Sequence, residues 1–334
     1  MSSSSRVRVG VVGAGHLGAL HAKMYDELDS AQLVGVYDID PVRCESVAGD
    51  LRVRAFLKLG ELIASAEAVS VATPTVTHHA IASSAIEGGL HAFIEKPITS
   101  TVGEAEELIR AADERKVKVQ VGHIERFNAA LLALEKYHLE PMFVESHRLS
   151  QFNPRGTDVA VVLDLMIHDI DIILSLVQSP VEKIDASGVA VVSDSVDIAN
   201  ARVQFENGCV ANVTASRISQ RKMRKMRLFQ RDAYISIDFS DGLAEVFRLV
   251  DASDQTANTT VMLGEIGEGK FKRKIVYEQP EVKEVNALKY ELESFLRSIR
   301  DDREPLVTAR DGLRALQVAD VIMEKIRDQS IRVS

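Results

Sequence analysis

Residues 7–38 read VRVGVVGAGHLGALHAKMYDELDSAQLVGVYD. The opening run, 7–12, is apolar and rich in valine, which is typical of a strand buried on both faces of a sheet. A glycine-rich turn follows, then a helical pattern, and a second apolar run at 33–37 ends at Asp38. The helical pattern predicts one apolar side composed of Leu17, Leu20, Met24 and Leu28. Strand, turn, helix and strand in this order predict the start of a doubly wound sheet.

The turn G-A-G-H-L-G contains three glycines, and each meets a separate physical need. Gly13 suits a tight turn, Gly15 lets a pyrophosphate approach the backbone, and Gly18 lets the helix pack closely against the strand. The helix begins where the turn ends, so its unpaired N–H groups and the positive end of its dipole face the phosphates. The expected contacts in this turn are Gly13, Gly15, His16, Leu17 and Gly18.

Asp38 ends the second predicted strand, twenty residues after Gly18. A carboxylate at this place accepts hydrogen bonds from the adenosine ribose of NAD and repels the 2′-phosphate of NADP. We therefore expect NAD as the cofactor, with Arg43 as the residue able to soften that preference. The competing interpretation is a tight turn with an incidental aspartate, and the complete strand–turn–helix–strand context favours the dinucleotide site.

The composition indicates a globular protein of two domains. The chain has 334 residues, of which 46% are hydrophobic and 27% charged, enough for two separate cores. Its net charge of −9 and the lack of a long basic block argue against nucleic acid as a partner. The cysteines, Cys44 and Cys209, offer neither a disulfide framework nor zinc-ligand spacing. The sequence contains no signal-peptide core and no membrane-spanning run, so we expect a cytoplasmic protein without a membrane partner.

Apolar and helical segments alternate up to Gly122 and predict a parallel sheet with crossover helices. The predicted strands are 68–72, 90–94 and 117–121; the predicted helices start at Pro41 or span 76–87 and 102–114. Ligands of such sheets bind at the carboxyl ends of the strands. This rule selects three loops, which are Thr73-Pro74-Thr75, Glu95-Lys96-Pro97 and Gly122-His123.

After Gly122 the pattern changes to that of an α+β domain. Residues 127–137 and 159–177 read as helices, and 181–250 read as long alternating strands with hairpin turns at Asn207-Gly208 and Asp241-Gly242. Helices at 285–299 and 309–326 close the chain. We expect a NAD-binding Rossmann domain at 6–123 and a domain for substrate binding and oligomerisation at 124–334, whose sheet is mostly antiparallel with helices on one face. The closing helices are candidates for packing back on the first domain.

Lys96 ends a predicted buried strand, between Glu95 and Pro97, where it would point into the ligand crevice near the nicotinamide. Burial and a neighbouring cation disfavour its charged form, which suits proton handling or stabilisation of an alkoxide. The alternative is a lysine that extends into water. Pro97 also permits a cis peptide bond, which would fix the direction of the lysine.

Asp164 and His168 occur in V-V-L-D-L-M-I-H-D-I-D, four residues apart and therefore on one face of a helix. Histidine titrates near neutrality and can accept a hydroxyl proton, while the carboxylate can orient it. The alternative is a polar pair on an amphipathic helix. A metal site made of His168, Asp169 and Asp171 is disfavoured because adjacent positions splay around the helix, so no metal is expected.

A basic run extends from Arg217 to Arg231 across a predicted hairpin. Such a run is commonly a solvated surface. The sharper hypothesis is an anion pocket for a phosphorylated or nucleotide-linked substrate, to which Arg126 and Arg155 would contribute.

The motifs G-A-G-H-L-G, A-T-P-T-V-T-H-H, E-K-P and D-L-M-I-H-D-I-D, in this order and spacing, resemble those of the Gfo/Idh/MocA oxidoreductases. The resemblance spans nearly the whole chain and implies a Rossmann domain followed by an open-faced antiparallel sheet that makes a homo-oligomer interface. It implies that Lys96 is the catalytic lysine, that Asp164 and His168 are the downstream pair, and that Pro74 and His78 lie in the cofactor-side loop. The stretch D-V-A-V-V-L departs from the glycines that many members have there, which affects the local shape of the substrate pocket.

Within the family, G-H-I-E-R-F-N at 122–128 and D-V-A-V-V-L-D-L-M-I-H-D resemble the bacterial UDP-N-acetylglucosamine 3-dehydrogenases, which oxidise a sugar hydroxyl to a ketone. The resemblance implies hydride transfer between nicotinamide and a hydroxyl of a sugar or nucleotide sugar, such as C3 of UDP-N-acetylglucosamine, by a homodimer or homotetramer. Two other functions stay open. One is a dehydrogenase or reductase of an inositol-like or other cyclic polyol, and the other is a non-catalytic NAD-binding sensor.

The predicted site therefore has three parts. The catalytic residues are Lys96, His168 and Asp164. The cofactor contacts are Gly13, Gly15, His16, Leu17, Gly18, Asp38, Thr73, Pro74, His78, Glu95 and Lys96. The substrate contacts are Lys96, His123, Arg126, Arg155, His168 and Arg217.

Overall fold

The computed structural model describes residues 6–153, 159–251, 261–267 and 272–333. These residues form two compact units. The first unit contains the chain through Phe127 together with Asn286–Gln317, and the second contains Asn128–Val285 and the residues from Val318 onward. The sequence places the division between residues 123 and 124. In the structure the first unit extends to Phe127 and also includes a later segment that begins at Asn286.

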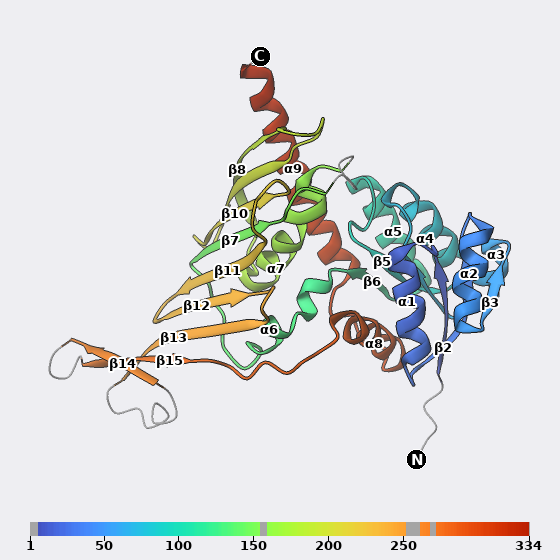
Figure 1. The fold of residues 1–334 in the computed structure, drawn as a ribbon, viewed down its shortest axis with the longest axis horizontal. Helices are drawn as coiled ribbons and strands as arrows, with labels where there is room; N and C mark the ends of the chain where they lie inside the picture. Colours follow the sequence, from blue (N-terminus) through green and yellow to red (C-terminus); the bar gives the residue numbers. More distant parts are fainter. Residues whose placement is uncertain (1–5, 154–158, 252–260, 268–271, 334) are drawn as a thin grey trace. The chain divides into compact units, whose positions relative to one another are not determined.

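The first unit is built on a six-stranded parallel sheet in the order β3-β2-β1-β4-β5-β6 (Figure 1). This order reverses between β1 and β4 and confirms the doubly wound sheet. The strands are β1 (Val7–Val12), β2 (Ala31–Tyr37), β3 (Arg54–Phe56), β4 (Ala68–Val71), β5 (His91–Glu95) and β6 (Val119–Gly122). The sequence did not predict β3 or the helix after it, α3 (Leu59–Ile63), because elements this short give no periodic signal.

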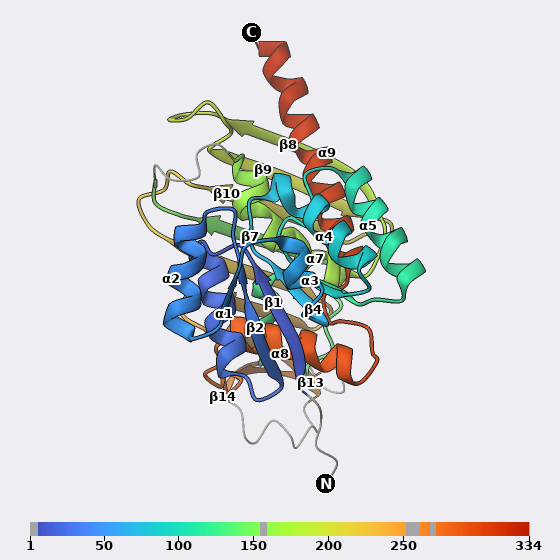
Figure 2. The same cartoon turned by 90° about the vertical axis from the view of Figure 1, so that its right-hand side faces the viewer.

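Helices cover both faces of this sheet (Figure 2). One face is packed by α1 (His16–Glu27), α2 (Pro41–Leu51) and α8 (Ala287–Arg300), and the other by α3, α4 (His78–Glu87) and α5 (Val102–Arg115). Local sequence sets where they begin. Asp40 accepts hydrogen bonds from the first backbone N–H groups of α2, and Thr101 and Glu104 form a reciprocal capping box at the start of α5.

Half of the apolar side predicted for α1 is wrong. Leu17 and Leu20 are 49% and 37% exposed, whereas Met24 and Leu28 are buried as predicted. The other buried positions of the helix are Gly18, His21, Ala22 and Tyr25. The reason is the close packing at Gly18, where a Cβ atom would lie 1.8 Å from the carbonyl oxygen of Gly13. This contact fixes the rotation of the helix, so that two polar rings face the sheet in place of two leucines.

The second unit contains a nine-stranded sheet in the order β14-β15-β13-β12-β11-β7-β10-β9-β8. Its neighbouring strands are antiparallel apart from the β7–β10 pair, which confirms the mostly antiparallel sheet. Both hairpin turns are confirmed, with Gly208 at φ +85° and Gly242 at φ +62°. The strands are β7 (Phe143–Leu149), β8 (Val181–Val189), β9 (Ile198–Phe205), β10 (Val210–Ser216), β11 (Met223–Gln230), β12 (Ala233–Asp238), β13 (Leu243–Asp251), β14 (Val261–Ile266) and β15 (Arg273–Glu278).

Helices α6 (Ala129–Leu132) and α7 (Ile167–Val177) pack on one face of this sheet. The strands alternate accordingly: Ala199, Ala201 and Val203 of β9 are buried on the helix side, while Asn200 and Arg202 are exposed on the open side. The last helix, α9 (Ala309–Val333), begins in the first unit and ends in the second. None of the helices in the described part of the chain is long and apolar enough to cross a bilayer.

Two local predictions in the second half of the chain are wrong. The helix predicted at 127–137 is a 3-10 turn, Ile124–Phe127, followed by the four-residue α6, because Asn128 is extended and caps a new helix start. The basic run does not cross a hairpin, because β10 and β11 lie on opposite sides of β7. The helix predicted at 159–177 is confirmed, and its first part is a π-helical turn, Val162–Met166, which α7 continues to Val177.

Candidate functional site

Four loops of the first unit begin at the carboxyl edge of the parallel sheet. They follow β1, β4, β5 and β6, which are consecutive neighbours in the sheet. The first is the glycine-rich turn, the second contains Thr73 and Pro74, the third contains Lys96, and the fourth begins at His123. The structure therefore brings these predicted positions together at the edge where doubly wound sheets bind their ligands.

The glycine-rich turn has the shape of a phosphate cradle. A Cβ at Gly13, whose φ is +100°, would lie 2.5 Å from the carbonyl oxygen of Ala72, so only glycine fits. By contrast, a Cβ built on Gly15 would meet nothing within 4 Å. Gly15 is also the N-cap of α1, and no side chain caps that end of the helix. An open approach and uncapped backbone N–H groups fit the pyrophosphate of a dinucleotide.

Asp38 lies directly after β2, beside this turn. Its Oδ2 accepts a hydrogen bond from the backbone nitrogen of Ala14 at 2.6 Å, and its Oδ1 accepts one from the backbone nitrogen of Asp40 at 2.8 Å. The guanidinium of Arg43 donates to the Asp40 carboxylate at 2.9 Å and holds the pKa of that carboxyl below its usual value. The one cation that the sequence offered against a preference for NAD is therefore paired locally with Asp40.

A cavity of about 330 Å³ adjoins Asp38. Its lining is mostly apolar and includes Ile39, Phe56 and Leu57. Ile39 and Leu57 are 90% and 75% exposed, which is unusual for large apolar side chains and suits contact with a flat apolar ring. Sequence reasoning missed this lining because β3 was not predicted. The one signal of this lining in the sequence is Ile39, a large apolar residue that directly follows Asp38.

His78 connects two of the loops at the carboxyl edge. Its ring is buried, with Nδ1 lying 2.9 Å from the carbonyl oxygen of Pro97 and Nε2 lying 2.9 Å from the carbonyl oxygen of Thr73. Carbonyl oxygens only accept hydrogen bonds, so both bonds form at once when both ring nitrogens bear protons. His78 thus holds the loop after β4 against the loop after β5.

Lys96 follows Glu95 at the end of β5, and the Lys96–Pro97 peptide bond is cis. The carboxylate of Glu95 folds back over β6, so that a Cβ at Gly122 would lie 3.0 Å from its Cδ. Glu95 Oε2 accepts a hydrogen bond from the backbone nitrogen of Lys96 at 3.3 Å. The carboxylate of Glu95 is therefore turned inward over the sheet.

The loop after β6 contains His123 and Arg126, both predicted to contact substrate. His123 is buried, at 1% exposure, and the guanidinium of Arg126 lies 3.9 Å from the carboxylate of Asp311 in the same unit. His123 is one residue past Gly122, which pairs with Glu95 in the sheet. Both side chains therefore belong to the strand end next to the E-K-P segment.

Asp164 and His168 belong to the second unit. Asp164 lies in the π-helical turn and His168 in the first turn of α7, and both are half-buried. Single π-helical turns often occur at functional sites. Asp169, next along the chain, forms a buried bidentate pair with Arg148 of β7, with oxygen–nitrogen distances of 2.8 and 3.1 Å. Asp169 therefore anchors α7 to the sheet.

Two further arginines were predicted to contact substrate. Arg155 lies outside the described residues. Arg217 is buried; its guanidinium lies 3.6 Å from the carboxylate of Asp197 and donates to the carbonyl oxygens of Val159 and Val196. These contacts link the loop after β10 to the start of β9 and to the segment before α7.

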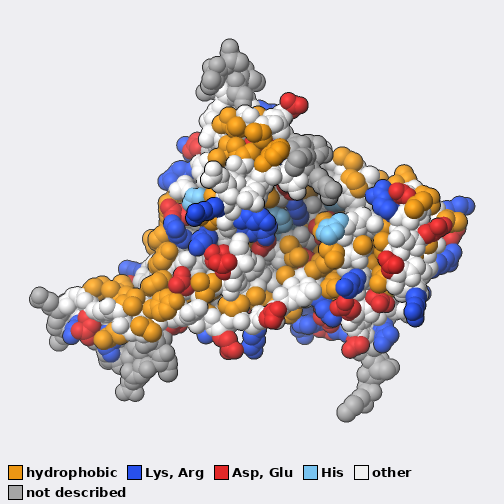
Figure 3. All heavy atoms as spheres, in the orientation of Figure 1, with side chains coloured by type: hydrophobic (Ala, Val, Ile, Leu, Met, Phe, Trp, Pro, Cys, Tyr) orange, Lys and Arg blue, Asp and Glu red, His pale blue; other side chains and the backbone are white. Residues whose placement is uncertain are grey.

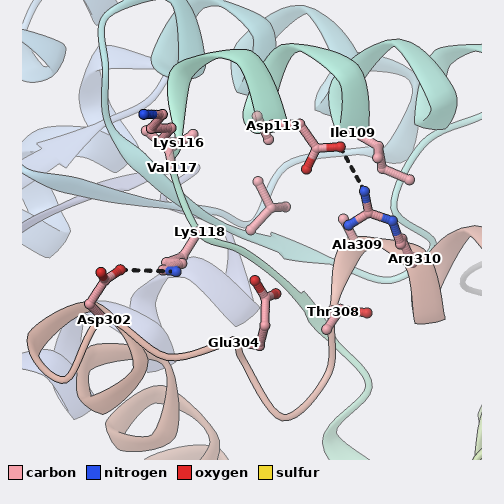
Figure 4. A pocket seen from close by; sticks show the side chains of 12 residues that line it. Ile109, Asp113, Lys116, Val117, Lys118, Asp302, Glu304, Thr308, Ala309 and Arg310 are labelled. Carbon is pink, nitrogen blue, oxygen red and sulfur yellow. Dashed lines mark hydrogen bonds and ion pairs between the residues drawn. The ribbon is translucent and has the colours of Figure 1, made fainter.

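A second cavity of the first unit lies at the start of β6, away from the carboxyl edge (Figure 4). It has a volume of about 370 Å³, and two ion pairs form among the side chains that line it. Lys118 lies 3.0 Å from Asp302, and Arg310 lies 2.6 Å from Asp113. Because these charges neutralise one another, this cavity does not compete with the carboxyl edge as the candidate site.

Comparison with known proteins shows the family of this chain. Residues 7–123 match a family model described as an oxidoreductase family with a NAD-binding Rossmann fold, and residues 122–243 match the GFO/IDH/MocA C-terminal domain. The UDP-N-acetylglucosamine 3-dehydrogenase of Acidithiobacillus ferrooxidans is 37% identical over 94% of this chain and 95% of its own. A solved structure of that enzyme has a TM-score of 0.86 at 35% identity, covering 96% of this chain and 98% of its own. The inositol 2-dehydrogenase of Rhizobium meliloti is 25% identical over 97% of this chain and 98% of its own.

The fold, the glycine-rich turn after β1 and the carboxylate of Asp38 after β2 are those of a NAD-binding oxidoreductase, which the family match shows. The chain belongs to the Gfo/Idh/MocA oxidoreductase family, and both the family resemblance and the narrower similarity seen in the sequence are confirmed.

Proposed function

We propose that this protein is a NAD-dependent dehydrogenase of a nucleotide-sugar hydroxyl, with C3 of UDP-N-acetylglucosamine as its reacting carbon. The observation on which this rests is Lys96, placed by β5 at the same sheet edge as the dinucleotide cradle. The similarity of 37% over nearly the full length to a UDP-N-acetylglucosamine 3-dehydrogenase favours this substrate over other sugars.

In this proposal Lys96 and His168 divide the work on one hydroxyl. The lysine binds the hydroxyl oxygen and stabilises the negative charge that develops on it, while His168 accepts the hydroxyl proton. Asp164 orients the imidazole and stabilises its charge. NAD, when bound, supplies the nicotinamide that accepts the hydride.

The residues proposed to hold NAD come from the first unit. Backbone groups of Gly13, Gly15, His16, Leu17 and Gly18 would contact the pyrophosphate, and Asp38 the ribose. The apolar cavity beside Asp38 has the size and exposed lining that an adenine ring requires. Thr73, Pro74 and Glu95 line the nicotinamide side, with His78 acting through the loops that it joins.

His123, Arg126 and Arg155 are the proposed contacts to the sugar and its diphosphate. Arginine suits this task because its planar donors match phosphate oxygens. We leave Arg217 out of this set, since its guanidinium is buried against Asp197 and two carbonyl oxygens.

The second candidate is a dehydrogenase of an inositol-like polyol, which the inositol 2-dehydrogenase similarity supports at 25% identity. The two candidates differ in the need for a diphosphate. The test is a panel of UDP-N-acetylglucosamine, other UDP-sugars, free N-acetylglucosamine and myo- and scyllo-inositol with NAD, monitoring reduced nicotinamide. We expect turnover with the UDP-sugar and little with free sugar or inositol. Turnover with inositol alone would favour the polyol enzyme.

We also propose a homo-oligomer formed through the open face of the nine-stranded sheet. Five aromatic rings cross that face in a continuous row, with centroid separations of 5.0–6.0 Å: Phe143, Phe229, Tyr234, Phe247 and Tyr277. Hydrophobic side chains also gather over β14 and β15 (Figure 3), where Val261, Met262 and Leu263 are each more than half exposed. Apolar surface of this extent on a sheet is typical of an interface between copies of one chain.

We propose a cytoplasmic location, as the sequence predicts. The free thiols of Cys44 and Cys209 are in keeping with a reducing compartment.

A further inference from the structure

A row of buried polar side chains connects α1 to the E-K-P segment within the first unit. The ring of His21 is fully buried between β4 and β5. Its Nδ1 lies 2.8 Å from the hydroxyl of Ser70, and its Nε2 lies 3.0 Å from Oε1 of Glu95. Ser70 is hydrogen-bonded in turn to Tyr25, one turn further along α1. Tyr25, Ser70 and His21 are each 0% exposed, so this row is shielded from water.

The protons in this row can be assigned from the chemistry of its ends. Nε2 of His21 lies 3.0 Å from the Glu95 carboxylate, and because a carboxylate only accepts hydrogen bonds, attraction between the two requires a proton on Nε2. Burial raises the pKa of Tyr25; the Ser70 hydrogen bond opposes this, and the charges of Glu291 and Glu95 add to it. Tyr25 therefore keeps its proton. Ser70 donates to Nδ1 when the imidazole proton is on Nε2.

Glu95 is contacted on three sides. Oε1 lies 3.0 Å from Nε2 of His21, Oε2 accepts from the backbone nitrogen of Lys96, and the carboxyl carbon lies against Gly122, where a Cβ would come within 3.0 Å. The carboxylate is adjacent in sequence to a cation. Released from His21, it could rotate about its own side-chain bonds toward the Lys96 ammonium, to which opposite charge attracts it.

We propose that His21 is a positioning residue for the reaction at Lys96: it holds the Glu95 carboxylate over Gly122, so that the lysine ammonium remains directed to the substrate oxygen. This inference rests on the proposed function, because it takes Lys96 as the group that binds the hydroxyl. His21 would act through Glu95 and touch neither substrate nor cofactor. Nothing in the sequence selects His21, since a histidine on the helix after a glycine-rich turn has the pattern of an ordinary core residue.

The test replaces His21 by Phe, which retains a ring against Phe93 but offers no donor to Glu95. We expect H21F to lower kcat about ten- to a hundredfold, the order of loss that follows from misplacing a reacting group. NAD affinity should fall much less than kcat, because the cradle and Asp38 are unchanged and only the Glu95 contact on the nicotinamide side is disturbed. His21→Gln keeps an amide donor and should recover most of kcat. A folded H21F with wild-type kcat would overturn the proposal.

Two further variants separate positioning from stability. Met24→Ala removes a buried side chain from the same helix without touching Glu95, so it should lower the Tm and leave kcat near wild type. Gly122→Ala pushes the Glu95 carboxylate from its other side, and because only the end of a flexible side chain must move, we expect a lower kcat with little change in Tm. A loss of kcat in Met24→Ala equal to that in H21F would show a merely structural role. Should H21F not fold, wild-type kcat in Gly122→Ala would overturn the proposal.

A measurement without substrate or cofactor distinguishes this proposal from the proposed function. Nitrogen-15 NMR of the protein alone should show a proton on Nε2 of His21, and Glu95→Gln should shift that signal. A bare Nε2 would overturn the inference even in an active enzyme. If the wild-type protein oxidised no sugar or polyol in the panel, the proposed function would fail, whereas the NMR result would still report whether His21 holds Glu95.

Discussion

Oδ2 of Asp38 lies 2.6 Å from the backbone nitrogen of Ala14, so the carboxylate that ends β2 accepts a hydrogen bond from the glycine-rich turn that follows β1. Its other oxygen accepts from the backbone of Asp40. Two backbone donors therefore orient the carboxylate before a ligand binds, which reduces the ordering cost of binding. The shape of the turn and the choice of cofactor depend on the same side chain.

Asp38→Ala should narrow the difference between the affinities for NAD and NADP, because it removes the charge that repels a 2′-phosphate. It also removes two charge-assisted hydrogen bonds, so we expect the free energy of unfolding to fall by about 1–3 kcal/mol. Equilibrium binding of both cofactors and urea denaturation measure the two effects. A variant that keeps the full preference for NAD would contradict the assignment of Asp38.

Asp40→Ala tests the part played by Arg43, since it removes a neighbouring carboxylate without touching the turn. Asp40 pairs with Arg43 and caps α2. Its loss should free Arg43 to approach a 2′-phosphate and raise NADP affinity, with NAD affinity little changed. Adding Arg43→Ala should cancel that gain.

His78→Ala should weaken NAD binding about tenfold and lower the free energy of unfolding by about 2–4 kcal/mol. The substitution leaves the carbonyl oxygens of Thr73 and Pro97 without their donor, and an unpaired buried acceptor costs about 1–3 kcal/mol. Isothermal titration with NAD and urea denaturation test the two losses. The neighbouring His79 is the control: it is partly exposed and pairs with Glu107 at 3.1 Å, so His79→Ala should change either quantity little. Equal effects of the two variants would argue against the loop connection.

Asp197→Asn should lower stability at neutral pH more than at acid pH. Burial by itself would raise the pKa of Asp197, but the backbone N–H of Val192, the Ser193 hydroxyl and the Val191 N–H hold it well below its usual value. A depressed folded-state pKa stabilises the protein above the unfolded value near 4, and this contribution is lost as pH falls through the folded value. Urea denaturation at pH 7 and pH 3 should show the gap between wild type and variant closing on acidification. A difference in the free energy of unfolding that stays constant with pH would contradict the assignment of this stabilisation to the ionised Asp197 carboxylate.

The first half of the fold could be predicted from the sequence because each strand of a buried parallel sheet is a separate apolar run. Each run ends in a loop that contains glycine, proline or a charged residue. The strands around Val69 and Phe93 are of this kind, and so the loops that contain Thr73 and Lys96 could be selected in advance. The antiparallel strands could be predicted because apolar and polar residues alternate along them, with Ala199, Ala201 and Val203 on the buried face of one strand.

The roles of His21 and Arg217 could not be predicted in the same way. Both depend on partners distant in the chain: Glu95 for His21, and for Arg217 the carbonyl oxygens of Val159 and Val196. A charged or polar residue in an apolar pattern has the same appearance whether it is paired in a core or faces a ligand. Only the tertiary contacts distinguish these cases.

Phe247→Glu should convert the proposed oligomer to a monomer of 36.7 kDa. Phe247 lies between Tyr234 and Tyr277 in the aromatic row, with ring centroids 5.4 and 5.0 Å away, so a carboxylate there would be buried by any copy that covers the row. Light scattering at micromolar concentration measures the mass. Lys58→Glu, an exposed change ahead of α3 in the first unit, should leave the mass of the wild type unchanged. A monomeric wild-type protein would contradict the proposed assembly.

Lys96→Ala and His168→Ala should each lower kcat on the nucleotide sugar by about 10²–10⁴-fold, the usual contribution of a positioned acid–base group. NAD affinity should change little, because neither side chain is needed to bind the adenosine or the pyrophosphate. If both residues act on one hydroxyl, the double variant should be scarcely slower than either single variant, since each needs the other to be effective.

Asp164→Asn should lower kcat less than either of these variants and should alter the pH dependence of kcat, because the proposed task of Asp164 is to orient His168. Lys58→Ala, a change of an exposed lysine ahead of α3, is the control for loss of a surface charge and should retain wild-type turnover. A double variant of Lys96 and His168 with wild-type kcat would exclude both from the chemistry and leave a protein that binds NAD without using these residues.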